Sequence, residues 1–193
     1  MEKKLTPFNA DYYLEKKILD IKNKYGITTA IETGTFHGAT TIWFSENFEK
    51  IYTVECNESY FLESGINIGN RANVIRKLQS SPIFLKEILP NIDEEKTLIF
   101  LDAHWYTNPV LDELEEIKKS GKKPIIVIHD FMVPDHPEFG YDVYPDQGIV
   151  YNWDWISKKI EEIYGPTGYH KEYNTKATGA MRGCLFILPK NKK

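Results

Sequence analysis

The sequence predicts an α/β fold with a doubly wound, mostly parallel seven-stranded sheet and an antiparallel C-terminal strand. Two runs, residues 97–101 and 124–128, are almost continuously apolar, which is typical of strands buried on both faces of a parallel sheet. Between them, Val110, Leu114 and Ile117 recur at helical spacing. A strand, a helix and a strand in this order indicate a parallel βαβ unit, and several such units in a row make an open sheet with helices on both faces.

The remaining elements follow from the same periodicities. A first helix over residues 11–24 has Leu14, Ile18 and Ile21 on one face and Gly26 as its stop. Short β-branched runs then alternate with longer amphipathic stretches. They predict strands at 28–32, 50–55 and 73–77 and helices at 40–47, 58–68 and 82–89, the last with proline in its first turn.

The C-terminal part differs in its order of elements. A helix at 153–164 is followed by two strands, 169–173 and 183–188, with no helix between them. We expect these two strands to pair antiparallel at or near the sheet edge. Residues 131–148 show no period, and long irregular loops inside compact domains are usually binding loops or lids.

Length, charge and composition narrow the function classes. The 193 residues are 41% hydrophobic and 13% aromatic, which predicts one globular domain over 1–193 with residues 1–26 as an N-terminal helical cap. A net charge of −4 argues against nucleic acid or an anionic membrane as partner. No apolar run reaches the roughly 18–20 residues that span a bilayer, and Met1 to Leu5 lack the apolar core of a signal peptide. With only Cys56 and Cys184, read as reduced thiols, we expect a cytoplasmic protein.

Acidic or polar residues stand at the carboxyl ends of four of the expected strands. They are Glu32, Glu55, Asp102 and the pair His129-Asp130. In an open parallel sheet, ligands bind outside the carboxyl ends of the strands, near the point where the strand order reverses. Any one of these residues alone could be an ordinary turn residue. The whole set predicts a binding site at this edge of the sheet.

The first strand-to-helix turn reads Glu32-Thr-Gly34-Thr-Phe-His-Gly38. Its glycines let the backbone approach a ligand closely, and the following helix offers free N–H groups. The dinucleotide pattern G-x-G-x-x-G is absent, because Phe36 stands where a second glycine would face a pyrophosphate. Glu32 would repel a diphosphate but suits a cationic ligand, and Glu55 could accept hydrogen bonds from a ribose diol. The pattern indicates a positively charged nucleoside; the alternative is a tight turn with two solvated acids.

These motifs, with Phe100-Leu-Asp102 ending the fourth strand, resemble those of class I S-adenosylmethionine-dependent methyltransferases. More closely, residues 31–130 resemble small metal-dependent O-methyltransferases of the catechol and macrolide-sugar types. The resemblance implies a Rossmann-like fold and S-adenosylmethionine as cofactor, with its methionine part near Gly34, its ribose at Glu55 and its adenine edge at Ser80-Ser81. Serines before a proline are also an ordinary helix N-terminus. The implied cofactor-binding residues are Glu32, Gly34, Thr35, Gly38, Thr40, Glu55, Ser80, Ser81 and Asp102.

In the sugar-modifying members of that family, acids after the fourth and fifth strands hold a divalent cation. The matching positions here are Asp102-Ala-His104 and His129-Asp130. The resemblance implies Asp102, His129 and Asp130 as metal ligands, with Mg²⁺ or Mn²⁺ as the candidates. His129 departs from the usual acid, and its alternative role is to orient Asp130. Two carboxylates and one imidazole favour a transition metal such as Mn²⁺ or Fe²⁺ over Mg²⁺.

O-methylation needs an activated hydroxyl. A cation bound to the hydroxyl oxygen lowers its pKa, and an adjacent histidine, with an unperturbed pKa of about 6.5, can take the proton. We therefore expect His104, which stands at the position of the usual base, and Asp102 to be the catalytic residues. The alternative for His104 is a packing role beside Trp105.

The loop at 131–148 leaves the fifth strand directly above this predicted site. Its acids can accept hydrogen bonds from hydroxyls, and its aromatic rings can stack on sugar C–H surfaces, so we expect a small-molecule substrate such as a sugar or other polyol. The alternative is a solvated loop whose aromatic side chains pack on the body. Tyr12 and Tyr13 could also reach the site if the leading helix folds over the sheet edge. The loop residues concerned are Asp135, Glu138, Phe139, Tyr141, Asp142, Tyr144 and Asp146.

Two other function classes stay open at this point. The separation of Gly34 and Glu55 also suits an NAD-dependent oxidoreductase, although Phe36 counts against it. A non-catalytic nucleoside-binding module of the same fold is the third class, because His104 and His129 depart from the family pattern. Members of the family are often dimers, so the resemblance also allows a homodimer.

Overall fold

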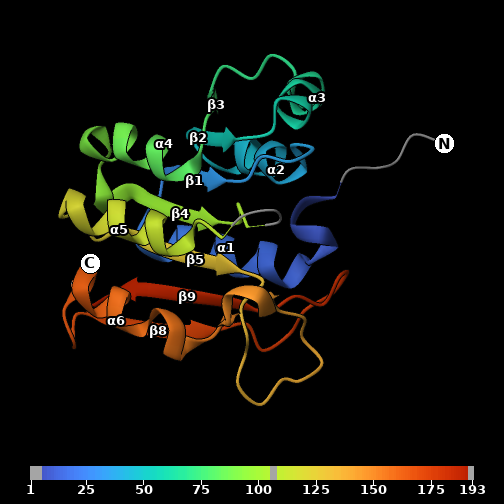
Figure 1. Cartoon of the computed structure of the whole chain (residues 1–193). Helices are drawn as coiled ribbons and strands as arrows, with labels where there is room; N and C mark the ends of the chain where they lie inside the picture. Colours follow the sequence, from blue (N-terminus) through green and yellow to red (C-terminus); the bar gives the residue numbers. More distant parts are fainter. Residues whose placement is uncertain (1–5, 105–107, 191–193) are drawn as a thin grey trace.

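A computed structural model of the chain describes residues 6–104 and 108–190 (Figure 1). Residues 1–5 and Trp105, which enter the expectations above, lie outside the described part. The helices are α1 (Tyr12–Tyr25), α2 (Ala39–Asn47), α3 (Glu58–Ile68), α4 (Ser81–Ile88), α5 (Val110–Ser120) and α6 (Trp153–Tyr164). The strands are β1 (Thr29–Thr33), β2 (Lys50–Glu55), β3 (Val74–Leu78), β4 (Thr97–Leu101), β5 (Ile125–His129), β6 (Val143–Tyr144), β7 (Ile149–Val150), β8 (Tyr169–Tyr173) and β9 (Cys184–Pro189).

The main sheet of the described residues has seven strands in the order β3-β2-β1-β4-β5-β9-β8. The strands from β3 to β5 pair in parallel, and the order reverses beside β1, where β4 joins on the side away from β2. The C-terminal strand β9 pairs antiparallel with β5 and with the edge strand β8. The predicted fold class, including the antiparallel C-terminal strand, is therefore confirmed.

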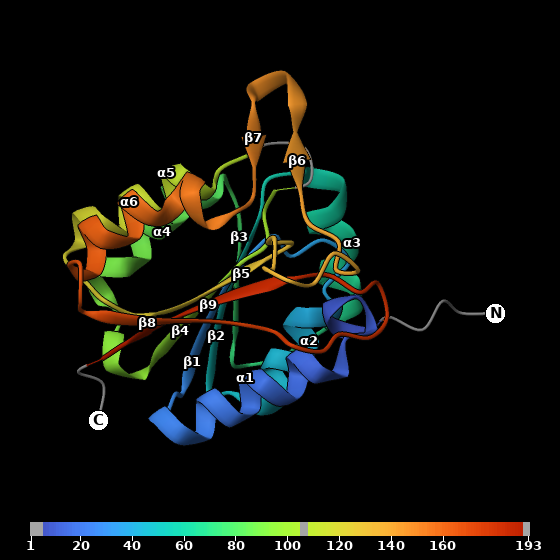
Figure 2. The same cartoon turned by 90° about the horizontal axis from the view of Figure 1, so that it is seen from below.

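The central strands β1, β4, β5 and β9 are buried on both faces, and their side chains alternate between two cores. Figure 2 shows α4, α5 and α6 on one side of the sheet and α1, α2 and α3 on the other. On the first side, Ile31, Ile99 and Ile126 pack with residues of α4 to α6. Their chain neighbours Ala30 and Leu98 point the opposite way, into the core shared with α1 and α2. This period of two explains why β4 and β5 are continuous apolar runs in the sequence.

Local signals fix the ends of the helices. Asp11 caps α1 by accepting hydrogen bonds from the N–H groups of Tyr13 and Leu14, and Gly26 ends it in the left-handed region at φ 60°. Gly121 ends α5 in the same way, at φ 70°. The left-handed conformation costs glycine little and other residues more, so each helix ends at the glycine that the sequence predicted as its stop.

The segment after β5 is more ordered than the sequence suggested. Part of it forms a short antiparallel hairpin, in which β6 pairs with β7 around a turn at residues 145–148 that ends on Gly148 at φ 64°. This hairpin projects from the body of the molecule (Figure 2). The turn is formed by a proline and a left-handed glycine. Its two strands are too short to show a hydrophobic period, so no pattern in the sequence predicted the hairpin.

The aromatic residues of this segment take different positions, and their stacking on a substrate stays a prediction. Phe139 is buried and packs with Val133 and Ala177. Tyr141 is exposed, at 37% of its surface. Tyr144 donates a hydrogen bond to the carbonyl oxygen of His104. Among the described residues, no helix combines the length and apolar character needed to cross a membrane.

Candidate functional site

The parallel register brings the predicted strand-end residues to one edge of the sheet. Thr33, the last residue of β1, is level with Val54 of β2 and Leu101 of β4, and Leu101 is level with Ile128 of β5. Glu55, Asp102 and the His129-Asp130 pair follow within two residues of these positions. The topology therefore places them along a common rim, at the reversal of strand order.

The glycines of the first turn serve contacts within the protein. Gly34 has φ 87°, and a Cβ built there would lie 2.5 Å from the carbonyl oxygen of Asp102. Gly38 has φ 84°, and its Cβ would lie 2.9 Å from the side chain of Ile68 on α3. Only glycine combines a left-handed backbone with such close approach. The turn is thus pressed against the residues after β4 on one side and against α3 on the other.

Glu32 points into the protein beneath this turn. Its Oε2 accepts hydrogen bonds from the hydroxyls of Thr41 and Thr53, the second at 2.6 Å, and its Oε1 has no partner among the described residues. Burial raises the pKa of Glu32 to about 8, against a smaller lowering by the two hydroxyls. The Thr35 hydroxyl joins the same group through a 2.6 Å contact with Thr53.

Glu55 holds the turn from the rim. One carboxylate oxygen accepts from the backbone N–H of Phe36 at 2.8 Å, and the other accepts from Asn57 N–H at 2.9 Å. Phe36 is itself in the left-handed region, at φ 49°, and its ring lies against His37 and Tyr60. Each oxygen of Glu55 keeps a further lone pair for an external donor.

The other predicted cofactor-binding residues take different positions. The Thr40 hydroxyl accepts the N–H of Phe8 at 3.1 Å, which ties the N-terminal segment to the first turn of α2. Ser80 occupies the N-cap position of α4 without a side-chain capping bond. Ser81 is buried and lies near the carboxyl group of Glu113.

A compact polar cluster lies beyond β4 and β5. His104 Nε2 lies 3.2 Å from Asp130 Oδ2 and 3.7 Å from Asp102 Oδ1. One ligand atom from each of these three residues can be chosen so that all lie within 4.8 Å of one another. His129 Nδ1 lies 3.2 Å from Asp102 and 3.3 Å from Asp130. Both histidines therefore face the same two carboxylates.

Opposite charges stabilise this cluster. Burial opposes protonation of His104 and His129, but the neighbouring aspartates outweigh it and raise the pKa of both imidazoles. Burial alone would raise the pKa of Asp130, yet the charges of His129 and His104 and the hydrogen bond from His104 hold it well below its ordinary value.

Neither a family model nor a curated protein matches the sequence. Solved structures do match it in fold. An O-methyltransferase from Bacillus cereus in complex with SAH is similar at 18% identity and a TM-score of 0.63, covering 92% of this chain and 81% of that chain. TomG from Streptomyces achromogenes, an O-methyltransferase of tomaymycin synthesis in complex with SAM, is similar at 17% identity and a TM-score of 0.59, covering 92% and 79%. A proposed methyltransferase from Streptococcus mutans, in complex with SAH, covers 98% of this chain and 99% of that chain at 14% identity and a TM-score of 0.60.

The chain has the fold of the class I S-adenosylmethionine-dependent methyltransferases. In this methyltransferase fold, the residues of the cluster come from positions far apart in the sequence. Two residues that the sequence analysis did not assign to the site lie beside it: Arg182 bonds Asp130 and Asp142, and Glu113 lies near Ser81 and Thr33. Arg182 gave no signal, because it lies in an irregular segment before β9. Glu113 did give one: it stands three residues after Val110, on the apolar face of α5.

The cluster fits a divalent cation in its donor types and its spacing. Carboxylate oxygens and an imidazole nitrogen are ligands that Mn²⁺, Fe²⁺ and Mg²⁺ accept to different degrees. The three residues whose ligand atoms converge are Asp102, His104 and Asp130. His104 thus takes the place in this set that was predicted for His129, while His129 contacts the same carboxylates from a fully buried position.

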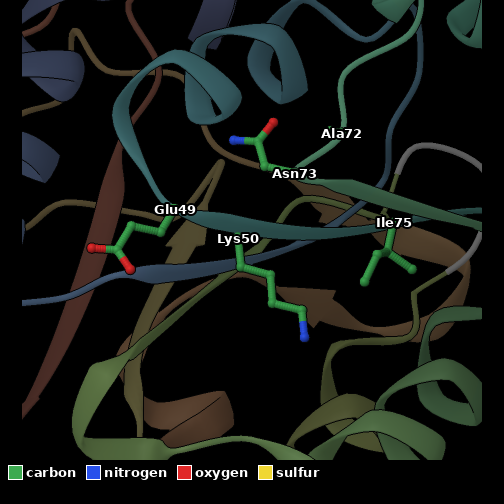
Figure 3. A pocket seen from close by; sticks show the side chains of 5 residues that line it. All are labelled: Glu49, Lys50, Ala72, Asn73 and Ile75. Atoms are coloured by element: carbon green, nitrogen blue, oxygen red, sulfur yellow. The ribbon is translucent and has the colours of Figure 1, made fainter.

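A surface hollow of about 500 Å³ lies elsewhere, at the amino ends of β2 and β3 (Figure 3). It is lined by Glu49, Lys50, Ala72, Asn73 and Ile75. The Asn73 amide already donates to the carbonyl oxygens of Ser45 and Phe48. Because this hollow is at the opposite ends of the strands from the cluster, it is not part of the candidate site.

Proposed function

We propose that this protein is an S-adenosylmethionine-dependent methyltransferase that methylates a hydroxyl group of a small molecule. The observation that supports this most is the rim itself: Glu55, Asp102, His104 and Asp130 stand together at the carboxyl edge of a sheet with the methyltransferase fold. Two solved O-methyltransferases of similar fold are complexes with SAH or SAM. Methyl transfer needs chiefly a sulfonium group held in line with its acceptor, so positioning supplies much of the rate.

For the cofactor, we propose the first turn and Glu55 as the main contacts. Glu55 would accept the ribose hydroxyls through the lone pairs that Phe36 and Asn57 leave free. Glu32 and Thr35 support the turn from beneath, through the hydrogen bonds that join Glu32, Thr53 and Thr35. Ser80 would lie at the adenine edge, whereas the nearness of Ser81 to Glu113 makes it a structural residue in this proposal.

For the acceptor, we propose that a divalent cation at Asp102, His104 and Asp130 assists the reaction. When bound, the cation would lower the pKa of the acceptor hydroxyl. His129 would keep the two carboxylates oriented. His104 then has two candidate roles, cation ligand or base, which Mn²⁺ binding by a His104 variant separates. The acids and aromatic residues of 131–148 support a sugar or other polyol as acceptor.

Calorimetry with SAH and NAD tests this proposal. We expect SAH to bind and NAD not to bind, because Phe36 fills the place where a dinucleotide needs glycine. Glu55→Gln should weaken SAH binding about tenfold or more, the cost of hydrogen bonds to a charged group. Glu58→Gln, at an exposed position three residues further on, is the matched control and should leave the affinity unchanged.

The same experiment decides between the function classes. No heat with either SAH or S-adenosylmethionine would overturn the methyltransferase proposal, and binding of NAD alone would replace it with an oxidoreductase. Cofactor binding without turnover on a panel of labelled acceptors, including nucleotide sugars and phenols, would favour a non-catalytic module.

A further inference from the structure

The segment after β5 is bonded to the residues that precede β9. The N–H of Phe131 donates to Gly183 O at 2.9 Å, Gly140 N–H to Met181 O at 2.8 Å, and Gly183 N–H to Gly140 O at 2.9 Å. Residues 131–142 thus leave the sheet, turn, and come back beside it. The N–H of Asp142 closes this path by donating to Asp130 O at 2.9 Å. The return brings a third aspartate next to the cluster.

Arg182 holds the two ends of this path together. Its Nε donates to Asp130 Oδ1 and its Nη2 to Asp142 Oδ1, so one guanidinium bridges the start and the end of the segment. The Arg182 side chain is 27% exposed, and those of Asp130 and Asp142 are 16% and 25% exposed. Gly140 makes room for it, because a Cβ there would lie 2.8 Å from Arg182 Nη1.

Asp130 is held in an unfavourable backbone conformation at the same point. Its φ is 55°, in the left-handed region that costs a non-glycine residue roughly 1–2 kcal/mol. Such strain persists only where surrounding contacts determine it. The contacts here are Arg182 and the two histidines, which together use both oxygens of Asp130.

The returning segment also reaches His104 directly. Asp142 Oδ2 lies 3.7 Å from His104 Nε2, and the Tyr144 hydroxyl donates to the His104 carbonyl oxygen. Asp142 O in turn accepts the N–H of Tyr151 at 3.0 Å. The position of His104 therefore depends on where residues 142–144 lie, and these depend on Arg182.

We propose that Arg182 is a positioning residue of the site: its guanidinium holds Asp142 next to Asp130, and thereby fixes His104 among the carboxylates. A role of this cluster in methyl transfer rests on the proposed function, whereas the positioning of Asp142 and His104 by Arg182 does not. Lysine should not replace it, because a single ammonium group cannot present two separate N–H donors in the fixed plane that two carboxylates require here.

Hydrogen exchange and NMR test this inference on the full chain. In Arg182→Gln and Arg182→Lys, we expect the amides of Gly140, Asp142 and Tyr151 to exchange about tenfold faster, through local opening of the segment. The ring signals of His104 should move in both variants. Arg71→Gln is the matched control, since Arg71 is similarly exposed and bonds Ser45 and Glu46 elsewhere on the surface.

A second variant keeps the test decisive if the Arg182 variants fold poorly. Asp142→Asn removes one charged partner and leaves the arginine, and it should give the same exchange and the same movement of the His104 signals. Exchange and His104 signals like those of the wild type in Asp142→Asn, or full rescue by Arg182→Lys, would overturn the inference. The exchange and NMR measurements need no cofactor, so failure of the wild type to bind SAH would defeat only the proposed function.

Discussion

At the scale of single residues, two buried glutamates have carboxylate oxygens without hydrogen-bond partners among the described residues. Glu32 lacks a partner for one carboxylate oxygen, and Glu113 lacks partners for both among the described residues. Burial raises the pKa of each, and for Glu113 the nearby hydroxyls of Ser81 and Thr33 oppose it only in part. A buried acid without full hydrogen bonding costs free energy unless it takes up a proton.

Glu32 makes the stability of the protein depend on pH. Its pKa is about 8 in the folded state and near 4.5 in the unfolded chain. Between these values the folded state holds a proton that the unfolded state has released. The contribution of Glu32 to the free energy of unfolding is therefore complete below about pH 4.5 and is lost as pH rises towards 8. Titration of this one group changes the free energy of unfolding by at most about 1.4 kcal/mol per pH unit.

Glu32→Gln should remove this dependence. Urea unfolding of the wild type and the variant from pH 5 to pH 8.5 is the measurement, and the gap between the two curves should shift steadily in favour of the variant. His104 and His129 also lose stabilisation as pH rises, but equally in both proteins. Parallel curves would contradict the assignment.

At the scale of elements, the first strand-to-helix turn is built by its neighbours. Glu55 of β2 holds Phe36, the chain after β4 presses against Gly34, and α3 presses against Gly38. The N-terminal residues add a further tie: Phe8 packs against Trp43, Phe44 and Phe100 and bonds Thr40 through its N–H. Tyr12 is exposed, and Tyr13 lies under Lys176, so the leading helix meets the segment before β9.

Gly34→Ala should be costly for this reason. A methyl group at Gly34 combines a left-handed backbone with a 2.5 Å approach to Asp102 O, so we expect a loss of roughly 2–4 kcal/mol. Gly121→Ala is the control: its φ is 70°, but nothing lies within 4 Å of the added atom, so only about 1–2 kcal/mol should be lost. Urea unfolding without cofactor measures both, and equal losses would show that contact with Asp102 is unimportant.

At the scale of the whole molecule, the polar cluster exists only because the fold assembles it. Asp102 and His104 follow β4, Asp130 follows β5, Asp142 returns from the loop and Arg182 precedes β9. A cation that binds this set therefore binds the folded state and stabilises it by mass action.

Mn²⁺ should raise the melting temperature of the protein. At a free concentration of about 100 times Kd, the gain is about 2.7 kcal/mol, or roughly 5–10 °C for a chain of this size. Asp130→Asn should lose the shift. His170→Ala, at an exposed histidine on β8, is the control and should keep it.

His104→Ala assigns the role of that histidine when the Mn²⁺ shift is combined with a turnover assay on the panel of labelled acceptors. Loss of the Mn²⁺ shift would identify a cation ligand, whereas a retained shift with lost turnover would identify the base. If the wild type itself shows no shift with Mn²⁺ or Mg²⁺, the cation is excluded and methyl transfer without it stands.

The sequence alone determined the order of elements and the edge at which the chemistry lies. Hydrophobic periodicity is a local property, so α1 to α6 and the strands of the main sheet could be predicted from it, with ends that differ by one or two residues. Parallel topology then requires Glu55, Asp102 and Asp130 to share one edge. The β6–β7 hairpin could not be predicted, because strands of two residues show no hydrophobic period.

Only the tertiary structure decided where the individual side chains point. In the tertiary structure, Glu32 points inward, and Gly34 and Gly38 make close contacts within the protein. His104 lies beside Asp102 and Asp130, and Arg182 bonds Asp130, which is more than 50 residues away in the chain. These outcomes depend on contacts between distant segments, and no local pattern encodes such contacts. The physical reason is that periodicity reports which face of an element is buried, whereas the partner of a polar group is set by how the elements pack.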